Sequence, residues 1–141
     1  MIRAVLDTNV VVSAVLSPSG PPFEIIASAS QKLVQLYASA AIFHEYREVL
    51  GRPQFDKLKA LSDFQLSELS KICRFVIPRK RVTASTDRDD NIFLECAEAA
   101  KAHYLVTGNI RHFPERWKYT KTVTPRQFLD LFGSPPRKIR R

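Results

Sequence analysis

Short apolar runs alternate with longer amphipathic segments along this chain, and this alternation restricts its fold more than any other feature. Runs typical of buried strands cover residues 2–6, 32–37, 75–77 and 104–107, and a fifth starts at residue 123. Segments with apolar residues at helical spacing cover residues 23–29, 39–50, 62–73, 90–102 and 125–132. Strands that alternate with helices are typical of a parallel sheet covered by helices. We therefore predict an α/β fold, a three-layer α/β/α sandwich with a mainly parallel central sheet.

The length and the charge distribution predict one domain with a basic extension. A chain of 141 residues is the size of a single domain with its own core. It has 22 Lys and Arg residues against 14 Asp and Glu, and four of those cations lie in the last five positions. We expect residues 1–132 to form the domain and residues 133–141 a basic C-terminal tail. Such a tail is either a solvated end or a contact for phosphates.

Several classes of protein do not fit this sequence. No stretch approaches the ~18 uncharged apolar residues of a membrane helix. The first residues show no cleavable signal pattern, so we expect a cytoplasmic protein without a membrane partner. Two cysteines, Cys73 and Cys96, are too few for a disulfide framework or a cysteine-based zinc site.

Polar residues follow two of the predicted strands. Asp7, Thr8 and Asn9 come directly after residues 2–6, and Asn109 closes the strand at 104–107. The carboxyl ends of parallel strands form the edge at which α/β proteins bind ligands. Asp7 could instead simply cap the turn that follows its strand, and Asn109 is a natural turn residue after a glycine.

Two further acids lie on predicted helices. Asp90 is near the start of the helix that leads into the fourth strand, so it could reach the same edge. With Asp87 and Asp89 it could equally form a helix cap and a favourable charge at the helix N-terminus. Glu45 lies in the middle of the helix at 39–50, where a solvated position is the simpler interpretation.

Taken together, these acids indicate a metal-dependent hydrolase. Three separated carboxylates without a Cys/His set suit a hard cation, and oxygen ligands select Mg²⁺ or Mn²⁺ over zinc. Mg²⁺ held by carboxylates keeps waters and accepts substrate phosphates as ligands, which is the chemistry of phosphodiester hydrolysis. The spacing alone is suggestive of that chemistry.

Four segments, taken in order, resemble the PIN-domain family, and within it the VapC-like toxins of prokaryotic toxin–antitoxin systems. The matching segments are residues 5–14, 44–53, 87–97 and 104–114, and residues 124–129 are similar to the end of this subfamily. The resemblance covers roughly residues 2–132. It implies a PIN-like fold and a Mg²⁺- or Mn²⁺-dependent ribonuclease.

The resemblance also implies a set of catalytic, metal-binding residues. Asp7 matches the aspartate after the first strand, Glu45 the helix glutamate, and Asp90 the aspartate before the Val-Thr strand, with Asp89 as the alternative one residue away. The fourth position, often aspartate, is Asn109 here, whose neutral amide is a weaker metal or water ligand. This departure puts a second metal in doubt.

Other polar and basic residues complete the expected site. Asn9 and Thr107 match polar positions that orient carboxylates or water around a metal site. Basic residues next to aromatic ones suit single-stranded RNA, although a solvated loop explains the same pattern. The candidates for RNA binding are Arg111, His112, Arg116 and Lys118.

The resemblance implies partners as well, and it leaves other functions open. It implies a cognate antitoxin protein that covers the acidic groove, and it allows a homodimer. The alternatives are a PIN-fold module that binds RNA or protein without cleaving it, and a phosphatase with Asp7 as nucleophile. The phosphatase is disfavoured because Asn9 stands where that chemistry usually needs a second carboxylate.

Overall fold

The computed structural model describes residues 1–85 and 87–132, and its centre is a six-stranded sheet in the order β3-β2-β1-β4-β6-β5. Its strands are β1 (Arg3–Leu6), β2 (Gln35–Ala38), β3 (Cys73–Phe75), β4 (Tyr104–Val106), β5 (Arg116–Trp117) and β6 (Thr120–Val123). All neighbours pair in parallel except β5, which runs antiparallel to β6. In the central pair, Ala4 lies opposite Tyr104 and Leu6 opposite Val106, so β1 and β4 end at the same edge.

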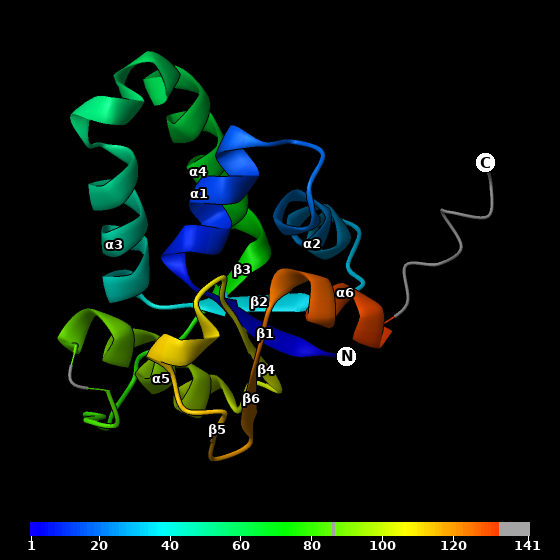
Figure 1. Cartoon of the computed structure of the whole chain (residues 1–141), viewed down its shortest axis with the longest axis vertical. Coiled ribbons are helices and arrows are strands. Elements are labelled where there is room, and N and C mark those ends of the chain that lie inside the picture. Colours follow the sequence, from blue (N-terminus) through cyan, green and yellow to red (C-terminus); the bar gives the residue numbers. More distant parts are fainter. Residues whose placement is uncertain (86, 133–141) are drawn as a thin grey trace.

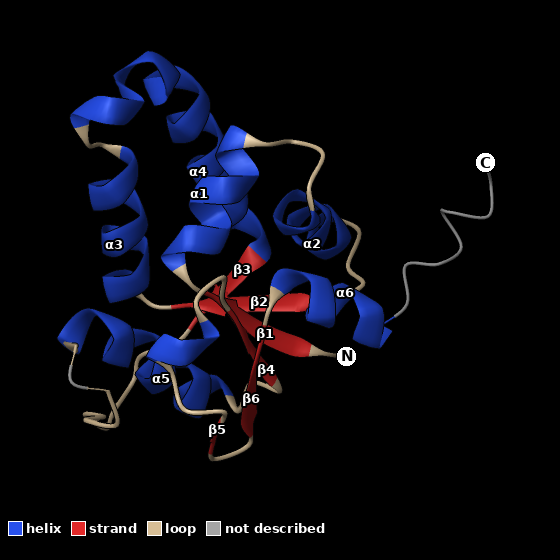
Figure 2. Ribbon diagram, in the orientation of Figure 1, coloured by secondary structure: helices blue, strands red, loops and turns tan. Residues whose placement is uncertain are grey.

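Helices cover both faces of this sheet (Figures 1 and 2). They are α1 (Thr8–Leu16), α2 (Pro21–Ser30), α3 (Ala40–Leu50), α4 (Lys59–Ile72), α5 (Arg88–Ala100) and α6 (Pro125–Phe132), with 3₁₀ turns η1 (Pro53–Leu58) and η2 (Ile110–His112). Figure 2 shows α5 on one face and α1, α2, α4 and α6 on the other. The predicted three-layer α/β/α arrangement with a mainly parallel sheet is confirmed.

Several predicted boundaries differ from the observed ones. The apolar residues 10–16, to which the pattern assigned no element, form most of α1. The third strand ends at Phe75 rather than Ile77, and the helix predicted from Ser62 begins at Lys59. Short apolar runs do not reveal where a strand ends, because the boundary depends on the neighbour with which it pairs.

The core lies on both sides of β1 and β4. The strand residues Ala4, Val5 and Leu105 are fully buried, and Phe43 and Phe93 pack nearby with almost no exposure. Burying each large apolar side chain contributes roughly 1.5–3 kcal/mol, so this packing holds the two central strands in a fixed position. The edge of the sheet is therefore a rigid support for the residues that follow it.

Within the two described ranges, no single helix is long and apolar enough to cross a membrane. Helices α1 and α2 meet the length and composition criteria only as a pair, with a bend of 96° between them. The predicted basic tail at 133–141 lies outside the described residues.

Candidate active site at the carboxyl edge of the sheet

Asp7 connects the end of strand β1 to the start of helix α1. It follows β1, and its backbone N–H donates to the Val106 carbonyl of β4 at 2.9 Å. Its side chain caps α1 by accepting a hydrogen bond from the Thr8 N–H at 2.8 Å. The side chain is only 8% exposed. The capping role considered from the sequence is therefore real, but it uses only one carboxylate oxygen.

The second oxygen of Asp7 is held by the two polar residues predicted to orient it. Thr107 Oγ1 donates to Asp7 Oδ2 at 2.7 Å, and Asn9 Nδ2 donates to the same oxygen at 3.2 Å. Thr107 Oγ1 also accepts from the Asn109 N–H at 2.9 Å, and Asn9 Oδ1 accepts from the Gly108 N–H at 3.0 Å. These bonds connect the segment after β1 with the segment after β4.

Gly108 lies against the Asn9 side chain. A Cβ atom at this position would lie 3.4 Å from Asn9 Oδ1, within ordinary van der Waals contact. The Gly108 N–H donates to Asn9 Oδ1, and this hydrogen bond helps to keep Asn9 positioned against Asp7.

Burial raises the pKa of all three predicted carboxyl groups, and neighbouring acids raise it further for Glu45 and Asp90. Burial raises the pKa of Asp7, while hydrogen bonds from Thr107 and Thr8 and the charge of His112 lower it in part. Burial also raises the pKa of Asp90, and the charges of Asp87 and Asp7 add to this effect. Carboxyl groups with raised pKa values that lie near another acid are typical of a site that accepts a cation.

Glu45 is the third member of this group. Burial raises its pKa first, followed by the charges of Asp89 and Glu48, while Arg52 lowers it and Asp7 raises it slightly. Asp7 therefore interacts electrostatically with both Glu45 and Asp90. The two adjacent aspartates interact with different acids. The charge of Asp7 raises the pKa of Asp90, and the charge of Asp89 raises the pKa of Glu45. The choice between Asp89 and Asp90 therefore stays open, since each acts on one of the other two acids.

The donor set fits a hard divalent cation without forming a closed cage. Within the described residues, no three His, Cys, Asp or Glu side chains are close enough together to enclose a metal ion. Mg²⁺ does not require such an enclosure, since it is usually held by one or two carboxylates together with waters and substrate phosphates. The carboxylates of Asp7, Glu45 and Asp90 supply only oxygen donors, which matches that preference.

The predicted RNA-binding residues are separated by the structure. His112, in η2, is close enough to lower the pKa of both Asp7 and Asp90. Arg111, next to it, lines a different hollow that also includes Lys121 and Gln127. Arg116 lies in β5 and Lys118 follows it, at the far edge of the sheet. The sequence neighbours therefore do not form one continuous surface.

The helix cap considered for the three aspartates is Asp87, which caps α5 by accepting from the Asp89 N–H at 2.9 Å. One important residue was not identified from the sequence. Tyr46, fully buried beside Glu45 in the chain, donates from its hydroxyl to the Leu6 carbonyl at 2.6 Å. The helical spacing of Tyr46 from Ile42 and Phe43 could have shown its burial, but its hydrogen-bond partner depends on the packing of α3 against β1.

Replacing Thr107 with Val should lower activity more than stability. The variant loses the hydrogen bond to Asp7 Oδ2, so the pKa of Asp7 rises further and the carboxylate is less firmly oriented. We expect kcat/KM for the reaction proposed below to fall about 10–100-fold, as for other residues that orient metal ligands. Thr120→Val is the matched control, since Thr120 Oγ1 donates to the Ala102 carbonyl at 2.7 Å in an equally buried position. Equal activity losses in both variants would contradict the role of Thr107.

Comparisons with known proteins identify the family. The PIN domain profile matches residues 3–111, which is most of the chain. The chain therefore belongs to the PIN domain family, whose members are generally nucleases, and the resemblance to this family is confirmed. It is 28% identical to the uncharacterized protein MJ1680 of Methanocaldococcus jannaschii over 93% of this chain and 92% of that protein.

Solved structures of two toxin–antitoxin proteins share the fold. One is VapBC2 from Rickettsia felis bound to a DNA fragment from its promoter, with 15% identity and a TM-score of 0.60, over 87% of this chain and 98% of that one. The other is VapBC-1 from nontypeable Haemophilus influenzae, with 16% identity and a TM-score of 0.59, over 89% and 99%. At this level of identity, the similarity defines the fold.

Proposed function

We propose that this protein is a metal-dependent endoribonuclease that hydrolyses RNA phosphodiester bonds with Mg²⁺, or alternatively Mn²⁺. The observation that carries the proposal is the buried carboxylate of Asp7, which is fixed at the ends of β1 and β4 and interacts with both Glu45 and Asp90. Membership of the PIN domain family supports a nuclease. Asp7, Glu45 and Asp90 would hold the metal, with Asp89 the alternative to Asp90 and Asn109 a weaker ligand.

Each residue of the site has a separate task in this proposal. When bound, the metal would lower the pKa of a water and offset the negative charge on the reacting phosphate. Thr107 and Asn9 orient Asp7 through the hydrogen bonds to Oδ2, and these bonds counteract part of the rise in its pKa. His112, in η2, acts electrostatically on Asp7 and Asp90, and its side chain would donate a hydrogen bond to a phosphate when an RNA strand is bound.

The partner that we propose is an antitoxin protein. The two structures with the same fold are described as VapBC complexes, which supports a toxin that is restrained by a cognate partner. Such a partner would have to cover the edge of the sheet where Asp7 lies. The proposal also allows the protein to form a homodimer.

Cleavage of end-labelled single-stranded RNA by the purified protein tests the function. We expect cleavage with Mg²⁺ or Mn²⁺ and none with EDTA. Cleavage that persists in EDTA would contradict metal dependence, and the absence of cleavage with every metal and with cellular RNA would contradict the nuclease.

The alternative is a PIN-fold module that binds RNA or protein without cleaving it. Two observations favour it, namely the neutral Asn109 and the absence of a closed three-carboxylate group within residues 1–85 and 87–132. Such a module would bind its ligand equally well with Mg²⁺ and with EDTA, and metal would leave its thermal stability unchanged.

Metal binding should stabilise the protein in a pH-dependent way. Because the pKa values of Asp7, Glu45 and Asp90 are raised on folding, ionising these groups costs stability as pH rises through their folded pKa values. Mg²⁺ binds the ionised groups and removes that cost. At ten times its dissociation constant, Mg²⁺ should add about 1.4 kcal/mol at neutral pH. Thermal melts at pH 5 and pH 7.5 would check this, and an Mg²⁺ shift as large at pH 5 as at pH 7.5 would contradict it.

A further inference from the structure

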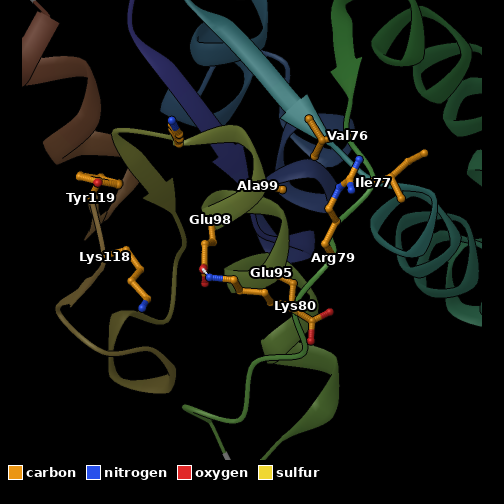
Figure 3. Close-up of a pocket in the computed structure, with 10 residues that line it drawn as sticks. Val76, Ile77, Arg79, Lys80, Glu95, Glu98, Ala99, Lys118 and Tyr119 are labelled. Carbon is orange, nitrogen blue, oxygen red and sulfur yellow. Dashed lines mark ion pairs between the residues drawn. The ribbon is translucent and has the colours of Figure 1, made fainter.

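A second surface suited to RNA lies along α5, away from the acidic group. It is a groove with a volume of about 470 Å³ whose floor is the solvent-facing side of α5. Figure 3 shows Arg79 on one side of this floor, Lys118 and Tyr119 on the other, and the Lys80 side chain reaching over α5 to Glu98. Lys101, at the end of α5, also lines the groove. None of Asp7, Glu45 and Asp90 is among its described lining residues.

The charge that this groove presents to solvent is positive. Its two acids, Glu95 and Glu98, are already paired. Glu95 is held by a forked ion pair with Arg88 and accepts from the Val82 N–H at 2.8 Å. Glu98 accepts from Trp117 Nε1 at 3.2 Å and pairs with Lys80 at 3.4 Å.

Exposure favours the cations over these acids. The Lys80 side chain is 77% exposed, whereas the Glu98 side chain is 19% exposed. Arg79, Lys101 and Lys118 are exposed as well. A ligand in the groove therefore meets ammonium and guanidinium groups first, and the groove is complementary to a polyanion.

Two of these lysines occupy backbone conformations that disfavour any side chain. In residues 1–85 and 87–132, the non-glycine residues with positive φ are Lys32 (66°), Lys101 (50°) and Lys118 (55°). Two of the three lie in this groove. Glycine adopts such a φ without a steric penalty, whereas lysine does not. The chain therefore has a lysine at two positions of this groove where the backbone conformation favours glycine.

Both lysines are also anchored. The Lys101 carbonyl accepts hydrogen bonds from Arg3 Nε at 3.0 Å and Nη2 at 2.9 Å. Lys118 Nζ lies 5.4 Å from the centroid of the Trp117 ring, in a cation–π contact. The backbone of Lys101 and the ammonium group of Lys118 are therefore held by contacts within the fold.

Aromatic and apolar surface lies beside the cations. Tyr119 is 72% exposed, and Ile77, across the groove, is also highly exposed. Exposed aromatic rings beside basic side chains suit a single strand of nucleic acid, since bases stack on the ring and phosphates lie near the cations. An acidic protein segment would use the cations but would have no need of the ring.

We propose that this groove binds single-stranded RNA at a site separate from the acidic group. It would hold the part of the strand that lies next to the bond to be cleaved. The inference rests on the proposed function in taking RNA as the ligand. Along α5, Glu98 is about 12 Å from Asp90 at 1.5 Å per residue. A few nucleotides of an extended strand cover that distance, so one RNA molecule can contact both surfaces.

The test measures binding without cleavage, by the fluorescence anisotropy of a 2′-O-methyl oligonucleotide of about 12 nucleotides with the full chain in EDTA. The variant is Lys101→Gly with Lys118→Gly, which removes two charges and suits the positive φ. The matched control is Lys32→Gly with Lys57→Ala, which removes the same charge from exposed positions elsewhere.

We expect the groove variant to bind about tenfold more weakly at low salt, and the control to change affinity less than twofold. The slope of log K against log salt should decrease by about 1.4 in the groove variant, since each lost phosphate contact to a single strand contributes about 0.7. Tyr119→Leu should weaken binding about fivefold, which corresponds to about 1 kcal/mol for one stacked base.

Three results would overturn the inference. The first is an equal loss of affinity in the groove variant and its control, which would indicate a response to net charge alone. The second is unchanged binding in Tyr119→Leu, and the third is competition by polyglutamate as strong as by the oligonucleotide. Because the readout needs neither metal nor cleavage, a failure of the proposed nuclease would appear separately, in the cleavage assay of the wild-type protein.

Discussion

Asp7→Asn should abolish RNA cleavage and leave the fold intact. The substitution removes the negative charge that acts on both Glu45 and Asp90, and with it one of the three carboxylates that we propose as metal ligands. We expect the rate to fall on the order of 10³-fold, as when a group that stabilises charge in the transition state is removed. End-labelled RNA with saturating Mg²⁺ measures this loss.

The stability of the same variant should change little. Asparagine caps a helix as well as aspartate does, so α1 keeps its first hydrogen bond. Because burial raises the pKa of Asp7, folding disfavours its ionised form, and the amide removes that cost. The amide nitrogen also replaces an oxygen that accepts from Thr107 and Asn9, and this loss offsets the gain. We therefore expect a melting temperature at pH 7.5 without metal close to that of the wild type.

Asp56→Asn is the control for this pair of effects. Asp56 lies exposed in η1, so its substitution changes the net charge by the same amount without touching the sheet edge. It should keep full activity. A fully active Asp7→Asn protein would refute the assignment of Asp7, and an inactive protein with a much lower melting temperature would show that Asp7 acts through the fold alone.

The sequence predicted Asp7 at the sheet edge because that position depends on a local pattern. The apolar run at residues 2–6 predicts a buried strand, and Asp7 follows directly at its end. Parallel pairing of β1 with β4 then places Thr107 at the same edge. The PIN resemblance contributed Glu45, whose position in the middle of a helix carries no local signal of function. Its inclusion in the acidic group follows from the packing of α3.

The sequence could not predict how the basic residues divide between surfaces. Arg111 and Lys118 are only seven positions apart, so the sequence indicates one continuous segment of basic and aromatic residues. The turn between β5 and β6 sends Lys118 toward α5, while Arg111 remains near α6. Which surface each residue joins depends on the antiparallel pairing of β5, a two-residue strand too short to be recognised from its composition.

Tyr46→Ala should be among the most destabilising substitutions in the domain. Tyr46 is one of the largest fully buried side chains, and its ring meets that of Phe43 edge-on at 5.0 Å. Removing a buried aromatic ring costs about 3–5 kcal/mol, against a total stability of about 5–15 kcal/mol for a domain of ordinary stability. Urea unfolding followed by circular dichroism would measure the change in the free energy of unfolding.

Tyr46→Phe separates the ring from the hydroxyl. It keeps the packing but leaves the buried Leu6 carbonyl without its 2.6 Å partner, which should cost about 1–3 kcal/mol. Leu6 precedes Asp7 and Tyr46 follows Glu45, so this hydrogen bond fixes the spacing between two of the proposed metal ligands. We expect the Phe variant to need more Mg²⁺ for half-maximal cleavage than the wild type.

Tyr119→Phe provides the comparison for the loss of a hydroxyl, because Tyr119 is exposed and lies far along the sheet from Glu45. Its stability and its Mg²⁺ requirement should both match those of the wild type. If Tyr46→Phe lowers stability but leaves the Mg²⁺ requirement unchanged, the hydrogen bond serves only the core. A changed Mg²⁺ requirement would mean that the packing of α3 against β1 sets the geometry of the acidic group, so that the interior of the domain and its chemistry are coupled through one hydroxyl.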